Sequence, residues 1–249
     1  MVGNMEWFGG SYKENPFIMF SANHFIMLAF LLIISAWIFL FRTKLRAKDW
    51  RSSEIGLAIL LTLFEVTYYV WLIRNRIWHV SDSLPLELCS ISLLLTIILL
   101  LTKKKWVYEI LLFTGLLGAT QALVTPLLYY DFPHFRFLHF FFTHFMMIWV
   151  PLYFTWVKGY RPTIWSVVKL LLFLNVLLPI IMAVNKLVNG NYMFLRHKPE
   201  SASLLDYLGP YPNYIFSMEG LLIALSLLIW LLFRKKAGNK PIRPKGLPR

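Results

Sequence analysis

The sequence contains one cysteine, Cys89, where a polar turn leads into an apolar stretch. A lone thiol forms no internal disulfide, so it is either a nucleophile or a small buried side chain. A thiol becomes nucleophilic when a neighbouring base, commonly a histidine, takes its proton. His144 falls in the same half of the predicted membrane protein as Cys89. The two are therefore the candidate catalytic pair, although a histidine hydrogen-bonded to another helix through Glu65 or Gln121 is the alternative.

Other polar side chains fall in that same half and are candidates for substrate binding, because ionisable groups inside a membrane are costly. Arg136 and His139 are three residues apart and share a helix face, where a guanidinium suits a phosphate. The alternative for Arg136 is an interfacial anchor. Gln121 or Thr125 could stabilise an oxyanion. The candidates for substrate binding are Arg136, His139, Gln121, Thr125, Glu65 and Glu219.

Three histidines, His134, His139 and His144, recur every five residues. Five residues rotate a helix by about 140° beyond one full turn, so three such side chains point in three directions. A single cysteine also argues against a thiolate-ligated ion. We therefore predict no metal site, and nothing in the sequence indicates a cofactor.

The elements that must position these residues are membrane helices. Of the 249 residues 58% are hydrophobic and the mean hydropathy is +0.61, too apolar for an ordinary soluble domain. Crossing the hydrocarbon core takes roughly 20 apolar residues. The sequence predicts an all-α, polytopic integral membrane protein with seven transmembrane helices. The predicted spans are residues 21–41, 54–73, 86–102, 106–126, 135–157, 164–186 and 213–233.

The basic residues behind the net charge of +13 are unevenly distributed among the loops. Seventeen Lys and Arg residues fall on one side of the predicted spans and seven on the other. Because basic residues favour cytoplasmic loops, we predict the N-terminus outside and the C-terminus inside, in a multi-pass protein of the plasma membrane. This distribution favours contact with anionic inner-leaflet lipids at the basic loops and tail over nucleic acid binding.

One domain is predicted over residues 1–236, because most connections between spans are short. The outer loop, residues 187–212, is the exception and is either a lid or an interfacial cap. Residues 237–249 form a basic tail that we expect to be disordered in the cytoplasm.

The motifs together resemble a known family. Leu84-Pro85-Leu86-Glu87-Leu88-Cys89 opens the third span, and Phe132-Pro133-His134-Phe135-Arg136-Phe137 opens the fifth. The outer loop adds Asn191-Tyr192-Met193-Phe194-Leu195 and Leu205-Asp206-Tyr207-Leu208-Gly209-Pro210. These segments are similar to the bacterial YwaF proteins, which are related to animal transmembrane protein 164. More distantly, the chain resembles the androgen-induced-gene hydrolases of lipid esters.

The resemblance implies a cysteine-dependent acyltransferase that moves fatty acyl chains between phospholipids and lysophospholipids. It implies that Cys89 is the nucleophile and His144 its base. Many bacterial members carry a histidine where this chain has Glu87. Hydrolysis of a lipid ester at the same site is the nearest alternative. A lipid-binding sensor or a transporter with an outward-facing cavity is the alternative that is not an enzyme.

Overall fold

The protein was analysed as a computed structural model, which describes residues 7–11, 13, 15–199 and 204–235. The predicted tail, residues 237–249, lies outside the described residues. The described part is helical apart from its loops and an isolated bridge between Pro16 and Tyr130. Helices suit a chain this apolar because each satisfies its own backbone hydrogen bonds in lipid.

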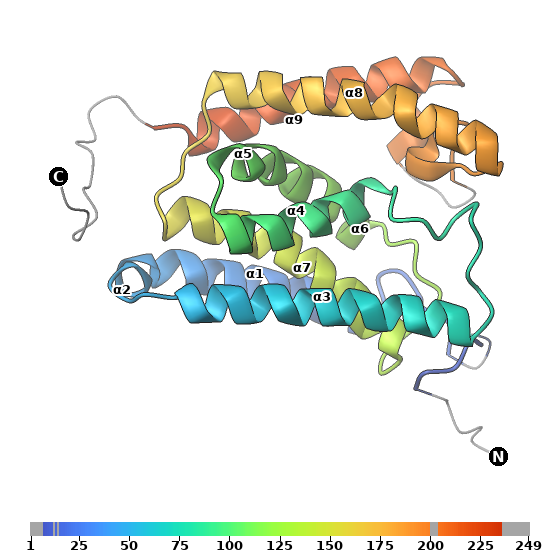
Figure 1. Cartoon of the computed structure of the whole chain (residues 1–249), viewed down its shortest axis with the longest axis horizontal. Coiled ribbons are helices and arrows are strands. Elements are labelled where there is room, and N and C mark those ends of the chain that lie inside the picture. Colours follow the sequence, from blue (N-terminus) through green and yellow to red (C-terminus); the bar gives the residue numbers. More distant parts are fainter. Residues whose placement is uncertain (1–6, 12, 14, 200–203, 236–249) are drawn as a thin grey trace.

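The helices form three layers (Figure 1). One outer layer holds α1 (Ala22–Leu40) and α3 (Arg51–Arg74), which are joined through the short α2 (Arg42–Arg46). The opposite outer layer holds α8 (Ile164–Val188) and α9 (Asn213–Phe233). Between the two layers lie α4 (Leu88–Thr102), α5 (Lys105–Phe113), α6 (Thr120–Val124) and α7 (Phe135–Trp156).

Six helical segments are long and apolar enough to cross a membrane, and they match six of the seven predicted spans. The other predicted span, residues 86–102, forms α4, which has only 15 residues. At 1.5 Å per residue α4 is about 22 Å long, about 8 Å less than the hydrocarbon core. The count of seven crossings and the orientation of the termini therefore stay predictions.

One helical turn in the middle layer is irregular. A π-helix, η1 (Thr114–Ala119), joins α5 to α6 and packs against α7. A Cβ atom built on Gly115 would lie 2.1 Å from the Met147 carbonyl oxygen, so only glycine allows this approach. Gly118 faces Leu88, the first residue of α4. The π-helix thus lies between α4 and α7, and π-turns are frequent at functional sites.

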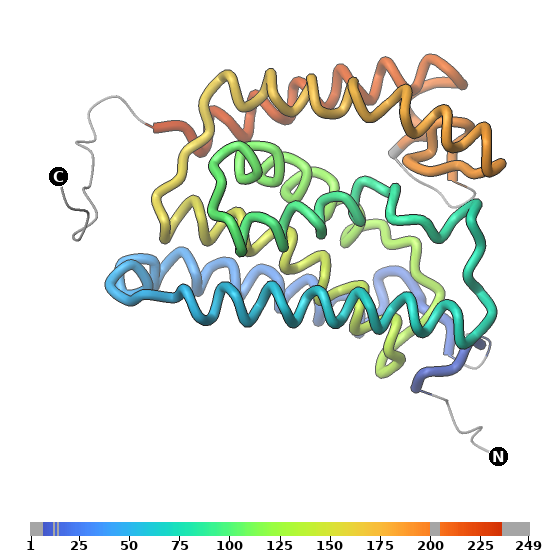
Figure 2. Tube along the Cα trace, in the orientation of Figure 1, coloured from blue at the N-terminus to red at the C-terminus, as the bar shows by residue number. Residues whose placement is uncertain are grey.

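The connection between α8 and α9 folds back onto the chain that leads into α4, as the tube in Figure 2 shows. It contains the 3₁₀ turns η2 (Tyr192–Phe194) and η3 (Leu204–Leu208). The Tyr192 hydroxyl donates to the Val80 carbonyl at 2.8 Å and accepts from the Leu84 N–H at 2.9 Å. The connection is therefore bonded to the segment that precedes Cys89.

Candidate functional site

Cys89 lies in the first turn of α4 and is a half-buried residue. Ser92 and Thr96 follow at three and seven residues, and both are buried on the face of α4 that meets the core. Cys89 packs against the same apolar core, which includes residues of α7. α4 also packs directly against α7, the helix that carries His144.

A carboxylate that the sequence analysis overlooked connects the ends of the two helices that carry Cys89 and His144. Glu54 on α3 is buried and lies 2.7 Å from the Lys158 Nζ, beyond α7, and 3.1 Å from the Lys103 Nζ, beyond α4. We call these residues, with the Tyr153 hydroxyl that donates to Glu54 at 2.8 Å, the Glu54 cluster. It holds the ends of α4 and α7 at one level.

The two candidate residues lie the same number of positions before the lysines of this cluster. Cys89 precedes Lys103 by fourteen residues and His144 precedes Lys158 by fourteen, about 21 Å along each helix. α4 and α7 run in the same direction (Figure 1), with Cys89 in the first turn of α4 and His144 near the middle of α7. No hydrogen bond joins the Cys89 thiol to His144 in the described part of the chain.

The His144 ring is buried and held in one orientation. Its Nδ1 lies 2.7 Å from the Phe140 carbonyl oxygen, one turn earlier on α7. A carbonyl only accepts, so Nδ1 carries the hydrogen and Nε2 has the free lone pair of a base. The ring also contacts the Phe140 ring, with centroids 4.2 Å apart. The alternative for His144, a hydrogen bond to Glu65 or Gln121, is not found among the described residues.

Glu65 instead bonds to His139. The Arg136 Nη1 donates to the His139 Nδ1 at 3.1 Å, and the His139 Nε2 donates to the Glu65 carboxylate at 3.1 Å. The His139 ring stacks on Tyr68 at 4.6 Å, and the Arg136 guanidinium also lies over Tyr68 at 4.6 Å. The predicted shared face of Arg136 and His139 is confirmed by their hydrogen bond. One of the guanidinium's two amino groups is used in it.

The remaining candidates lie in two separate places. The Gln121 side-chain amide donates to the Thr125 hydroxyl at 2.8 Å on the exposed side of α6. Glu219 accepts from Asn175 at 2.7 Å between α9 and α8. Glu219 is therefore in the opposite outer layer from Glu65 (Figure 1).

Each of the three evenly spaced histidines has a different partner. His134 Nε2 donates to the Gly9 carbonyl at 3.0 Å, while His139 and His144 bond as described above. The three rings thus diverge, and His134 lies outside α7 as its N-cap. Groups of three or more histidine, cysteine or carboxylate side chains that could hold a metal ion do not occur among the described residues.

Two further groups escaped the sequence analysis. Glu109 and Lys169 bond to each other at 2.5 Å between α5 and α8. The buried hydroxyls of Ser92 and Thr114 have no hydrogen-bond partner among the described residues. Ser92 lies one turn beyond Cys89 and Thr114 begins the π-helix, so both are near the interface of α4, η1 and α7.

Comparison with known proteins gives one match. The TMEM164 family model matches residues 19–230, a range that includes Cys89, His144 and all the candidates for substrate binding. Neither the curated proteins nor the solved structures gave a match. The match covers most of a chain with six candidate membrane spans. The chain belongs to the TMEM164 family.

Proposed function

We propose that this multi-pass membrane protein is a lipid acyltransferase of the outer leaflet of the plasma membrane. The observation that carries the proposal is His144, a base with a free Nε2 on the helix that packs against the one carrying the protein's only thiol. The resemblance to YwaF and to lipid-ester hydrolases supports the same chemistry.

The predicted topology relates the depth of Cys89 to that of a lipid ester. With its C-terminal end at the level of one membrane surface, α4 begins about 8 Å below the other boundary of the hydrocarbon core. Acyl esters of phospholipids lie at that boundary, with their chains directed inward. The proposal therefore requires the ester carbonyl to move about 8 Å inward to reach the thiol.

The proposed reaction has two balanced steps. His144 Nε2 takes the proton of Cys89, whose sulfur attacks the ester carbonyl carbon. The ester C–O bond breaks, and the departing lysophospholipid oxygen receives that proton. In the second step His144 takes a proton from an acceptor hydroxyl, which attacks the thioester and restores the thiol. Splitting the transfer in this way is the advantage of covalent catalysis.

The other candidates have supporting roles in the proposal. Arg136 keeps unused donors for the donor phosphate, and its hydrogen bond to His139, which in turn bonds to Glu65, orients it. Gln121 or Thr125 stabilises the oxyanion. Water attacking the thioester instead of a lipid hydroxyl would make the same site a hydrolase.

An alkyne-tagged phospholipid tests the proposal. Purified protein is incubated with it, and a hydroxylamine-sensitive adduct is measured in the wild type, Cys89→Ala, His144→Ala and a control, Ser90→Ala. We expect no adduct with Cys89→Ala, labelling slowed about 10²- to 10⁴-fold with His144→Ala, and wild-type labelling in the control.

Three outcomes would contradict it. No adduct and no acyl exchange in the wild type would exclude the enzyme and favour a sensor or transporter. An adduct that survives Cys89→Ala would exclude this nucleophile. Release of free fatty acid without acyl exchange would identify a hydrolase.

A further inference from the structure

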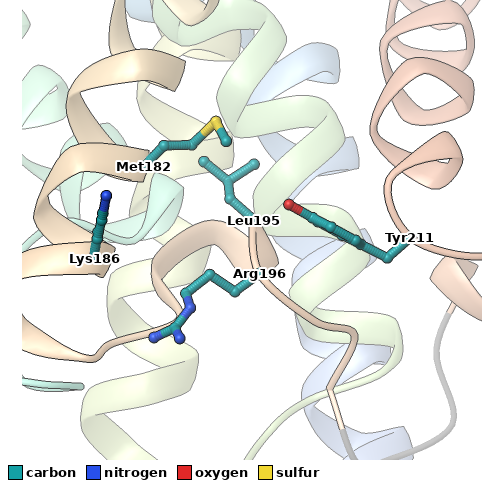
Figure 3. Close-up of a pocket in the computed structure, with 5 residues that line it drawn as sticks. All are labelled: Met182, Lys186, Leu195, Arg196 and Tyr211. Carbon is teal, nitrogen blue, oxygen red and sulfur yellow. The ribbon is translucent and has the colours of Figure 1, made fainter.

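A pocket of about 240 Å³ lies between the last turns of α8 and the α8–α9 connection. It is lined by Met182, Lys186, Leu195, Arg196 and Tyr211 (Figure 3). The lining combines two cations with three large apolar side chains. None of these residues belongs to the site proposed above.

The two cations have no carboxylate partner among the described residues. Arg196 is positioned by neutral acceptors, because its Nη1 donates to the Asn189 side chain at 2.8 Å and to the Gly190 carbonyl at 3.2 Å. Its Nε and its other amino group are left for a ligand. Lys186 makes no hydrogen bond or ion pair within the described ranges and is exposed. Two uncompensated cations beside one pocket favour an oxyanion, and a guanidinium with free donors favours phosphate in particular.

The apolar lining indicates that the oxyanion carries a hydrocarbon chain. Met182 lies one helical turn before Lys186 on α8, so the apolar wall is displaced from the cations towards the middle of the helix. Leu195 forms a buried wall, and Tyr211 extends towards it, hydroxyl end first, from the segment before α9 (Figure 3). A ligand with a phosphate at one end and methylene groups at the other matches this polarity.

The pocket also borders the segment that leads into Cys89. Leu195 packs in one apolar cluster with Leu84 and Leu86, which precede α4. The Met193 N–H donates to the Glu87 carboxylate at 3.0 Å. The wall of the pocket and the residues before Cys89 are therefore one packed unit.

We propose that this pocket binds the phosphate headgroup of an acyl-bearing lipid, with Lys186 and Arg196 on the phosphate and Met182, Leu195 and Tyr211 on the first methylene groups of its chain. Binding is independent of catalysis. Only the further step, that the bound lipid is a donor or acceptor for Cys89, rests on the proposed function.

Binding of a fluorescent lysophosphatidic acid to the purified full chain in neutral detergent tests the proposal. Monoacylglycerol with the same chain tests the need for phosphate, and competition by inorganic phosphate tests the need for the chain. The variants are Lys186→Gln, Arg196→Gln and their combination. The matched control is Lys13→Gln with Arg76→Gln, which removes the same charge from exposed positions at that end of the bundle.

We expect each single substitution to weaken binding of lysophosphatidic acid about tenfold, and the combination to weaken it further. Monoacylglycerol should bind weakly to every variant, and the control should bind like the wild type. Wild-type affinity in the double variant, or an equal loss in the control, would overturn the proposal. Inorganic phosphate that binds as tightly as lysophosphatidic acid would show a free-phosphate site instead of a lipid site.

The Cys89→Ala variant separates this inference from the proposed function. It should bind lysophosphatidic acid like the wild type. If the wild type binds this lipid through Lys186 and Arg196 but transfers no acyl group, the pocket stands and the acyltransferase fails. Equal melting temperatures of the binding variants and the wild type show that lost binding is not lost folding.

Discussion

Replacing Gly115 by alanine tests the packing that holds the π-helix against α7. The new Cβ atom would lie 2.1 Å from the Met147 carbonyl oxygen and 3.1 Å from the Met147 carbonyl carbon. Ordinary contact begins at 3.4 Å, so the two backbones must separate locally by at least about 1 Å. Overpacking of this kind costs about 1–3 kcal/mol, and more where backbone must move.

The assay is thermal unfolding of the purified protein in detergent. For a chain of this length 1 kcal/mol corresponds to about 2–4 °C in Tm, so Gly115→Ala should unfold several degrees below the wild type. Gly220→Ala is the matched control, because nothing lies within 4 Å of its added Cβ atom on α9. That substitution should raise Tm slightly, since alanine is favoured over glycine in helices by about 0.5–1 kcal/mol.

The same substitution connects packing to function. Met147 follows His144 by three residues on α7, so a displaced α7 also displaces the proposed base. Gly115→Ala should therefore slow acyl transfer as well as lower Tm. Equal Tm values for the Gly115→Ala variant, the Gly220→Ala variant and the wild type would refute the packing argument.

Two further substitutions test other contacts. Glu54→Gln removes the charge that pairs with two partly exposed lysines and should cost at most about 3 kcal/mol, seen as a lower Tm. The control is Glu219→Gln, which should change Tm little because the partner of Glu219 is a neutral amide. Equal shifts in Tm would contradict the role of the Glu54 cluster. Burial lowers the pKa of His134, which precedes α7, and the charge of Arg136 lowers it further. A lowered pKa means that stability is present above the usual histidine value of about 6.5 and is lost as the pH falls below it. His134→Asn keeps a side-chain acceptor for the helix N-terminus, so its Tm should fall less than that of the wild type between pH 7.5 and pH 5; parallel pH profiles would contradict this.

The sequence was a good guide to the helices. An apolar run of about 20 residues has few alternatives in a bilayer, so six predicted spans match structural helices to within a few residues. The third span was predicted two residues too early, at 86, because leucines alternate through the segment before Leu88.

The polar contacts were predictable only where the partners are close in sequence. Arg136 and His139 share a turn, and their contact follows from helical spacing. Glu54 meets Lys103 and Lys158 across forty-nine and one hundred and four residues, and no local pattern encodes that pairing. The close approach at Gly115 and Gly118 was not predictable, because glycine alone does not distinguish a π-helix from lipid-facing space.

The burial of α7 also bears on how the protein is made. Of the six candidate spans α7 has the lowest hydropathy, 1.4, and 78% of its apolar window is buried inside the protein. It carries Arg136, His139 and His144, all costly to expose to lipid. As it leaves the ribosome α7 is thus poorly suited to partition alone into the bilayer. Its insertion has to be cooperative with helices synthesised before it, which shield those side chains as soon as it arrives.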